Sequence, residues 1–302
     1  MMLSDCPEIF EGCRLERRAV GRLTGTQKTS TVCHAFMTIK LEQARVTDHA
    51  PIQGGYKLLW MDAPSVAPQV RPGQFVHVLI PHLGEAVLRR PFSVFKAEGN
   101  RLAILYKDVG RGTKTLGYLR AGEGVNLIGP LGNGYPEQQP DTYPLLVAGG
   151  YGMAALYMKA QRSPSPGVAF FGGRTAGDIL CVEEFEALGW EVRVTTNDGS
   201  LGVRGVVTDE LDRWLARDGV DRKPEVFACG PGAMLEAVSE RALRADWPTW
   251  ISVDSNMGCG VGACLTCVVK IKAGDGWAWK RSCKEGPVFA ARDVVWEKAG
   301  VL

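Results

Sequence analysis

The sequence carries almost no net charge, only four histidines and no long apolar run. A formal charge of +2 over 302 residues argues against a nucleic-acid surface or a polybasic membrane patch. Apolar runs such as residues 143–148 are far shorter than the roughly 20 residues that a membrane-spanning helix needs. The N-terminal segment MMLSDCPEIFEGC has early acidic residues and lacks the apolar core of a secretory signal. We therefore expect a cytoplasmic protein whose cysteines stay reduced.

Cysteine, by contrast, is abundant. The chain has nine cysteines, and four of them lie close together near the C-terminus. In a reducing compartment a group of four indicates a metal site, whereas scattered cysteines mostly behave as small buried apolar residues. The scattered five are Cys6, Cys13, Cys33, Cys181 and Cys229.

The N-terminal half predicts a small β-barrel. Residues 1–30 show no clear period, and we interpret them as an N-terminal extension. Over residues 31–140, short apolar runs recur between Gly and Pro punctuation, which favours an antiparallel barrel of six strands. The expected strands are 36–46, 56–63, 74–81, 90–95, 101–108 and 124–130, with a helix expected over 114–119.

The sequence pattern changes over residues 141–245. Strands alternate with helices there, which indicates βαβ units and a parallel sheet covered on both faces. The expected strands are 143–148, 167–173, 191–198 and 225–230, and the expected helices are 154–161, 179–188, 205–218 and 232–245. The remaining segment, 246–302, holds the four cysteines and a Trp-rich hairpin. The sequence thus predicts a multidomain α/β plus β protein.

The spacing of the C-terminal cysteines is the most specific pattern in the chain. It reads C-x4-C-x2-C with a fourth cysteine further on, the spacing of plant-type [2Fe–2S] sites. Two bridged irons need four thiolates around a compact core, and a glycine-rich loop can supply three of them. A structural zinc site is the alternative, but zinc fingers favour two C-x2-C pairs and only one is present. The predicted ligands are Cys259, Cys264, Cys267 and Cys283.

Two motifs in the barrel have the chemistry to hold an anionic flavin nucleotide. The motif 90–93, Arg-Pro-Phe-Ser, offers a guanidinium for a pyrophosphate and a hydroxyl for a flavin edge. Taken alone, this motif is better explained as an ordinary strand with an exposed Arg pair. The turn 109–113, Val-Gly-Arg-Gly-Thr, can bind an anion through backbone N–H groups at the start of a helix.

Two further turns follow expected parallel strands, where such sheets bind dinucleotides. The turn 149–153, Gly-Gly-Tyr-Gly-Met, is not a G-x-G-x-x-G fingerprint and by itself is only suggestive. The turn 229–232 begins with Cys229, which either contacts a nicotinamide ring or is a small buried residue at a strand end. The sequence favours neither interpretation of Cys229.

These elements, in this order, resemble the ferredoxin–NADP reductase superfamily, and in particular the electron-transfer subunits of NAD-dependent (type 1B) dihydroorotate dehydrogenases. The resemblance covers residues 35–296 and rests on RRPFSVF, LYKDVGRGT, GPLGNGY, VAGGYGMAAL, FFGGRT, VTTNDGSLGVRGVVTDEL, FACGPGAML, MGCGVGACLTC and CKEGPVF. It implies an FAD-binding barrel over 31–140, a nicotinamide-binding α/β domain over 141–245 and a [2Fe–2S] domain over 246–302.

The resemblance also implies which residues hold the cofactors. For FAD it implies Arg90, Pro91, Phe92, Ser93, Leu105, Tyr106, Lys107, Gly112 and Thr113. For the nicotinamide nucleotide it implies Gly149, Gly150, Gly152, Met153, Arg174, Asn197, Asp198, Cys229, Gly230 and Pro231. The family's usual turn has an isoleucine where this chain has Tyr151, and a proline where it has Ala155.

The function that the resemblance implies is electron transfer between NAD(H), FAD and the cluster, which needs no general acid or base. The chain has no barrel large enough for the FMN-containing catalytic subunit that makes orotate, so we expect that subunit as a partner in a heterotetramer. A reductase subunit of another redox complex, linked to hydrogenase or ferredoxin, is the first alternative. A non-catalytic zinc-bearing interaction protein is the second. Because no clear Arg/Lys pair follows FFGGRT, the sequence mildly favours NAD over NADP.

Overall fold

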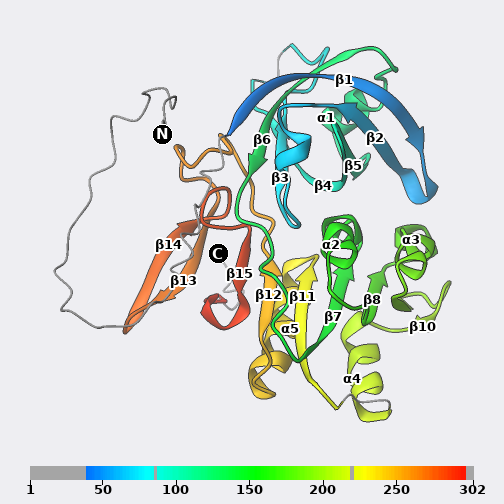
Figure 1. Cartoon of the computed structure of the whole chain (residues 1–302), viewed down its shortest axis with the longest axis vertical. Helices are drawn as coiled ribbons and strands as arrows, with labels where there is room; N and C mark the ends of the chain where they lie inside the picture. The colour runs from blue at the N-terminus through cyan, green and yellow to red at the C-terminus, as the bar shows by residue number, and fades with distance from the viewer. Residues whose placement is uncertain (1–38, 85–86, 218–220, 297–302) are drawn as a thin grey trace, which may run out of the picture. The chain divides into compact units, whose positions relative to one another are not determined.

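The computed structural model describes residues 39–84, 87–217 and 221–296 (Figure 1). The expected N-terminal extension, with Cys6 and Cys13, lies outside the described residues, as does Cys33. No helix in the described ranges is long and apolar enough to cross a membrane.

The first part of the described chain forms a closed barrel, as the sequence predicts. Its six strands pair antiparallel in the order β1-β2-β5-β4-β3-β6. In β1 the alternate residues Glu42, Ala44 and Val46 are buried, the period-2 pattern of a strand with one face in a core. The elements are β1 (Lys40–Pro51), η1 (Gln53–Gly55), β2 (Tyr56–Asp62), η2 (Ala67–Gln69), β3 (Phe75–Val78), β4 (Arg90–Glu98), β5 (Arg101–Lys107), α1 (Arg111–Leu116) and β6 (Gly124–Leu131).

A seven-stranded sheet follows, in the order β10-β9-β8-β7-β11-β12-β15. Its central strand β7 is buried on both faces: Leu146 packs in the core that holds α2 and α3, and Leu145 in the core that holds α4 and α5. The strands are β7 (Thr142–Gly149), β8 (Val168–Gly173), β9 (Glu191–Thr196), β10 (Val203–Arg204), β11 (Lys223–Cys229), β12 (Thr249–Ser252) and β15 (Val288–Ala290). The helices are α2 (Gly152–Gln161), η3 (Ala176–Asp178), α3 (Val182–Ala187), α4 (Val207–Arg217), α5 (Gly232–Arg244) and η4 (Ala291–Asp293).

The sheet runs further along the chain than the expected βαβ pattern. β12 pairs parallel with β11, and β15 pairs antiparallel with β12, so the cysteine-bearing segment supplies the last two strands. These strands have only four and three residues, too few to show a period in the sequence. The remaining strands, β13 (Val268–Ala273) and β14 (Gly276–Arg281), form the expected Trp-rich hairpin.

Two helices start three residues away from their expected first residue. Helix α3 starts at Val182 rather than at residue 179, because Cys181 at its N-cap adopts a left-handed conformation with φ of 62°. Helix α1 starts one turn earlier than expected, at Arg111. Neither difference moves a motif to another element.

Candidate functional site

The loop that carries the first three cysteines folds its backbone around Cys259. The Cys259 Sγ accepts hydrogen bonds from the backbone N–H groups of Val261, Ala263 and Cys264, at 3.4, 3.2 and 3.4 Å. Gly260 and Gly262 have φ values of +73° and +84°, which residues with a Cβ rarely adopt. Such N–H groups stabilise a thiolate and tune the potential of a cluster that it holds.

The four thiols interact most strongly as two pairs, and Cys283 also interacts with Cys259. The Cys259 and Cys264 thiols interact, and the Cys267 and Cys283 thiols interact, with the Cys283 N–H also 3.4 Å from the Cys267 Sγ. Hydrogen bonds from Thr266 and then Cys259 lower the pKa of Cys264 to about 6, whereas burial and the Cys267 thiol raise the pKa of Cys283 to about 12. Among the described residues, no three Cys, His, Asp or Glu side chains gather around one ion. Paired thiols fit a cluster of two irons, each of which takes two thiolates.

The fourth cysteine is fixed by contacts with the barrel. The backbone N–H of Asn133 donates to the Gly286 carbonyl at 2.6 Å, and its side-chain amide donates to the Glu285 carbonyl at 3.0 Å. Gly132 faces Pro287 so closely that a Cβ there would lie 2.5 Å from the proline ring. The motifs GPLGNGY and CKEGPVF, far apart in the sequence, are therefore one packed unit.

Strand β3 lies between the cysteine segment and the Arg-Pro-Phe-Ser strand. Phe75 of β3 packs with Leu131 and with the buried Cys267 and Cys283. In the neighbouring strand β4, Ser93 pairs with Phe75 and Pro91 pairs with His77. Adjacent strands are about 4.8 Å apart, so the predicted flavin-binding strand lies next to the strand that packs against the predicted cluster ligands.

The predicted flavin residues differ in how accessible they are. Arg90, Pro91, Phe92 and Ser93 are all half-buried. Arg90 donates to the carbonyl oxygens of Leu88 and Arg89 and forms no ion pair with a described carboxylate, which leaves its charge available to an anion.

The neighbouring turn of α1 supports the same anion interpretation. A Cβ on Gly112 would lie 3.7 Å from the Arg90 Nε, so Gly112 borders the guanidinium. The Thr113 hydroxyl, by contrast, is occupied, because it accepts from the N–H groups of Val109 and Gly110. Leu105 and Tyr106 on β5 are buried, and the Tyr106 hydroxyl lies 2.9 Å from the His49 Nε2.

Two predicted site residues meet on a carboxylate that the sequence did not reveal. The Lys107 Nζ lies 2.6 Å from the Asp178 Oδ1, and the Arg174 Nε lies 2.9 Å from its Oδ2. The Tyr56 hydroxyl donates to the same carboxylate at 3.1 Å. Burial alone would raise the pKa of Asp178, but these three hydrogen bonds outweigh it and hold the pKa well below its usual range. No local motif marks Asp178, because its partners come from β2, β5 and the end of β8.

The glycines of the turn after β7 are required by close contact with the turn after β11. A Cβ on Gly152 would lie 2.1 Å from the Cys229 carbonyl oxygen, and one on Gly149 would lie 2.7 Å from Pro231. A Cβ on Gly230 would lie 2.9 Å from the Gly149 nitrogen. The two predicted nicotinamide turns therefore lie against each other at the carboxyl ends of adjacent parallel strands.

The other predicted nicotinamide residues differ in solvent exposure. Met153 is fully buried and its sulfur accepts the Leu180 N–H at 3.1 Å, so its side chain belongs to the core. Cys229 is also buried, and burial followed by the nearby Asp254 raises the pKa of its thiol to about 12. Asn197 and Asp198 lie in the exposed turn after β9.

Tyr151, which departs from the family's pattern, links the nicotinamide turn to the segment before the cysteines. Its hydroxyl donates to the Asp254 Oδ2 at 3.3 Å. Burial raises the pKa of Asp254, while this hydrogen bond lowers it in part. Gly150, next to Tyr151, lies close to the Tyr56 hydroxyl: a Cβ built on Gly150 would lie 3.7 Å from that oxygen.

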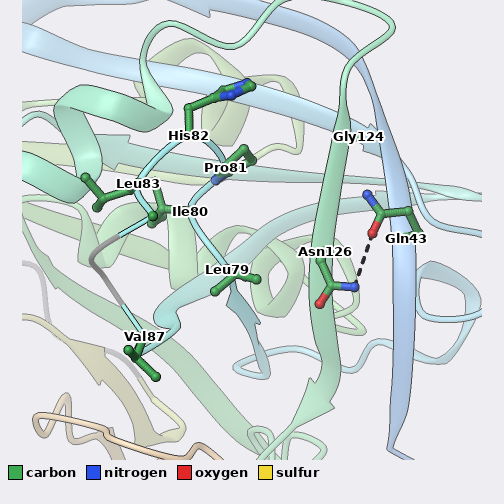
Figure 2. A pocket seen from close by; sticks show the side chains of 10 residues that line it. Gln43, Leu79, Ile80, Pro81, His82, Leu83, Val87, Gly124 and Asn126 are labelled. Carbon is green, nitrogen blue, oxygen red and sulfur yellow. Dashed lines mark hydrogen bonds between the residues drawn. The ribbon is translucent and has the colours of Figure 1, made fainter.

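A cavity of about 490 Å³ lies on the barrel side, away from the cysteine loop. Figure 2 shows its lining from residues 79–84, Val87, β6 and β1, with the amide of Asn126 hydrogen-bonded to Gln43 at 3.2 Å. None of the predicted site residues lines it. The cavity comes near the predicted flavin site at Ile80, whose Cγ1 would lie 3.8 Å from a Cβ built on Gly112.

Comparison with known proteins connects this geometry to a described family. Residues 254–295 match the model of the iron-sulfur cluster binding domain of dihydroorotate dehydrogenase B. The chain is 39% identical over 242 residues to the dihydroorotate dehydrogenase B (NAD(+)) electron transfer subunit of Desulforamulus reducens, covering 78% of this chain and 91% of the relative. It is 40% identical over 233 residues to the subunit of the same description from Geobacillus kaustophilus, covering 74% and 87%.

Solved structures are similar over most of the chain. A chain of an NADH-dependent reduced ferredoxin-NADP oxidoreductase, studied for flavin-based electron bifurcation, aligns with a TM-score of 0.73 and 30% identity over 84% of this chain and 90% of the other. Phthalate dioxygenase reductase aligns with a TM-score of 0.56 and 17% identity, over 78% and 87% of the two chains, and shares the fold.

Proposed function

Because the chain belongs to the family of dihydroorotate dehydrogenase B electron transfer subunits, we propose that it passes electrons between NAD(H), FAD and a [2Fe–2S] cluster, to or from a catalytic partner that oxidises dihydroorotate. Bound flavin supplies the exchange between a two-electron hydride donor and a one-electron cluster. The observation that carries the proposal is the place of β3, with the paired thiols on one side and the Arg-Pro-Phe-Ser strand on the other.

The cluster ligands in this proposal are Cys259, Cys264, Cys267 and Cys283. Their pairing and the N–H groups directed at Cys259 support it.

The flavin site in this proposal is β4 together with the turn into α1. Arg90 and the backbone beside Gly112 bind the pyrophosphate, and the half-buried Ser93 and Phe92 contact the ring. Leu105 and Tyr106 of β5 are buried and pack beneath this site. Lys107 and Thr113 lie at its edges, where Lys107 pairs with Asp178 and Thr113 accepts a hydrogen bond from Val109. Pro91 pairs with β3.

The nicotinamide site in this proposal is the edge formed by the turns after β7 and β11. Gly149, Gly150, Gly152, Gly230 and Pro231 keep the backbone free of side chains for a nucleotide. Met153 and Cys229 shape this edge from beneath, and Arg174, Asn197 and Asp198 border it from the turns after β8 and β9. We propose NAD rather than NADP, since Arg174, the basic residue directly after β8, is already paired with Asp178.

The domain boundaries in this proposal are 31–140 for FAD, 141–245 for the nicotinamide nucleotide and 246–302 for the cluster, after an extension over 1–30. With these boundaries, β12 and β15 of the cluster domain are strands of the sheet of the nicotinamide-binding domain. We also propose a cytoplasmic location and a heterotetramer with an FMN-containing catalytic subunit, which supplies the dihydroorotate chemistry that this chain lacks.

The experiment is a spectrum followed by reconstitution. The purified chain should absorb as an oxidised flavin with an iron–sulfur shoulder, and NADH should bleach both. Together with the catalytic subunit, it should reduce NAD⁺ at the expense of dihydroorotate. Colourless protein with one bound zinc would refute the electron-transfer function, and a flavin and cluster without dihydroorotate-dependent turnover would refute only the pyrimidine partner. The similarity to the ferredoxin-NADP oxidoreductase chain makes ferredoxin the substrate to test in that second case.

A further inference from the structure

A histidine lies at the junction between the proposed flavin strand and the cysteine loop. His77 is the third residue of β3, pairs with Pro91 of β4, and is fully buried. Its position two residues from Phe75 puts both side chains on the same face of β3, the face that meets the cysteine segment. Among the described residues, neither of its ring nitrogens has a hydrogen-bond partner.

Buried polar atoms without partners are rare in native proteins, because they keep the cost of leaving water. Burial and the nearby Arg89 and Arg90 lower the pKa of His77 to about 4, so the ring is neutral near pH 7. A neutral imidazole has one N–H donor and one acceptor nitrogen. Each of them needs a partner.

The face of the His77 ring lies against Gly260. A Cβ built on Gly260 would lie 2.6 Å from the His77 Nδ1, 2.9 Å from its Cγ and 3.0 Å from its Cε1. These nearly equal distances place Gly260 over the ring, where it occupies the hydrogen-bonding direction of neither nitrogen. The ring N–H group therefore needs an acceptor that the described residues do not supply.

We propose that His77 is a positioning residue of the electron path: its ring packs against Gly260 of the cysteine loop from β3, and its N–H group donates a hydrogen bond to a bound redox group, a flavin heteroatom or a cluster sulfur. The inference rests on the proposed function. A donated hydrogen bond stabilises the reduced, more negative form of the acceptor, so His77 raises that group's midpoint potential.

The test measures potentials in the complete chain. The wild-type protein is first shown to hold flavin and cluster, and failure at that step would count against the proposed function rather than against His77. Flavin and cluster midpoint potentials are then measured by visible and EPR redox titration in His77→Phe, which keeps an aromatic ring and removes both nitrogens. A control, His82→Asn, removes an exposed imidazole five positions along the chain.

We expect His77→Phe to lower the potential of one of the two groups, with a roughly two- to tenfold change in its redox equilibrium from the loss of one hydrogen bond. A tenfold change corresponds to about 59 mV for a one-electron couple. The group that shifts is the acceptor: a flavin shift identifies a flavin heteroatom, and a cluster shift identifies a sulfur. Unchanged potentials for both groups, or the same shift in His82→Asn, would overturn the proposal.

Two amide variants keep the test decisive if His77→Phe fails to fold. Gln carries its amide near the place of the imidazole Nε2, and Asn carries it near that of Nδ1. We expect one of the two variants to keep the wild-type potential, which identifies the donating nitrogen, and the other to have a lowered potential. Equal potentials in the Gln and Asn variants would refute the hydrogen bond.

Discussion

The cysteine loop and the nicotinamide edge are built in opposite ways. Three of the four cysteines come from one short loop, and its glycines and N–H groups serve the same thiols. The nicotinamide edge comes from turns separated by tens of residues, each of which is modest on its own. A site made by one loop is visible in the sequence as a spacing, whereas a site made by several strands becomes visible only when the sheet is formed.

The largest expected effect is at the cysteine loop, where the loss of one ligand removes the site. Cys283→Ala should abolish the iron–sulfur absorbance and EPR signal while FAD stays bound, because the Cys267 and Cys283 pair loses a thiolate. Iron content and EPR of the reduced protein measure this. Cys181→Ser, at a cysteine far from the loop, is the matched control, and equal iron loss in both variants would show that the cluster is elsewhere.

The next effect should be at the nicotinamide edge. Gly152→Ala places a Cβ 2.1 Å from the Cys229 carbonyl oxygen, and backbone cannot move aside as a side chain can. We expect a loss of about 1–3 kcal/mol in the free energy of unfolding, from overpacking, and weaker binding of NADH.

Gly232→Ala is the control for that substitution, since it meets no atom within 4 Å at the start of α5. It should stabilise the chain by about 0.4–1 kcal/mol. Equal effects of the two substitutions in denaturation would show that the turns do not touch in solution.

An effect of similar size on stability is expected at Asp178, whose carboxylate is one of the links between the barrel and the sheet. Asp178→Asn should lower the free energy of unfolding by about 1–3 kcal/mol, because Lys107 and Arg174 lose their partner. The folded-state pKa is below the ordinary value of about 3.9, so this stability is fully present above that pH and is lost as the pH falls through the folded pKa. Denaturation at pH 5 and pH 7 should give the same difference.

Glu98→Gln provides the contrast for Asp178, since Glu98 pairs with Arg101 at 3.6 Å and both side chains are about half exposed. Surface pairs of this kind contribute about 0–1 kcal/mol. If Glu98→Gln lowers the free energy of unfolding as much as Asp178→Asn does, burial does not strengthen the ion pairs of Asp178.

The smallest effect should come from Tyr151→Phe, which removes only the hydrogen bond to Asp254. Since this bond partly offsets the raised pKa of Asp254, its loss raises that pKa further. A raised carboxyl pKa makes stability fall as the pH rises, so the variant should be less stable by about 0.5–1.5 kcal/mol at pH 7 and closer to wild type at pH 4. A larger deficit at pH 4 than at pH 7, in urea denaturation, would contradict this.

Most of the fold was predictable, because the barrel strands and the βαβ units have long, regular patterns. β12 and β15 were not, since short strands acquire their identity from their partners. Of the site, the sequence pattern gives the cysteine loop and the turns after β7 and β11. Asp178 and His77 could not be found, because their significance lies in which distant residues meet them: Lys107 and Arg174 in one case, Gly260 in the other.

The pairing of β12 and β15 with the sheet affects how a newly made chain folds. Strand β11 is covered at its open side only by strands from the segment that also carries the cysteines. A newly made chain in which that segment stays unfolded presents β11 as a bare, apolar edge, the kind of surface that recruits other chains into aggregates. Folding of that segment therefore protects the sheet from aggregation, in addition to supplying the proposed cluster ligands.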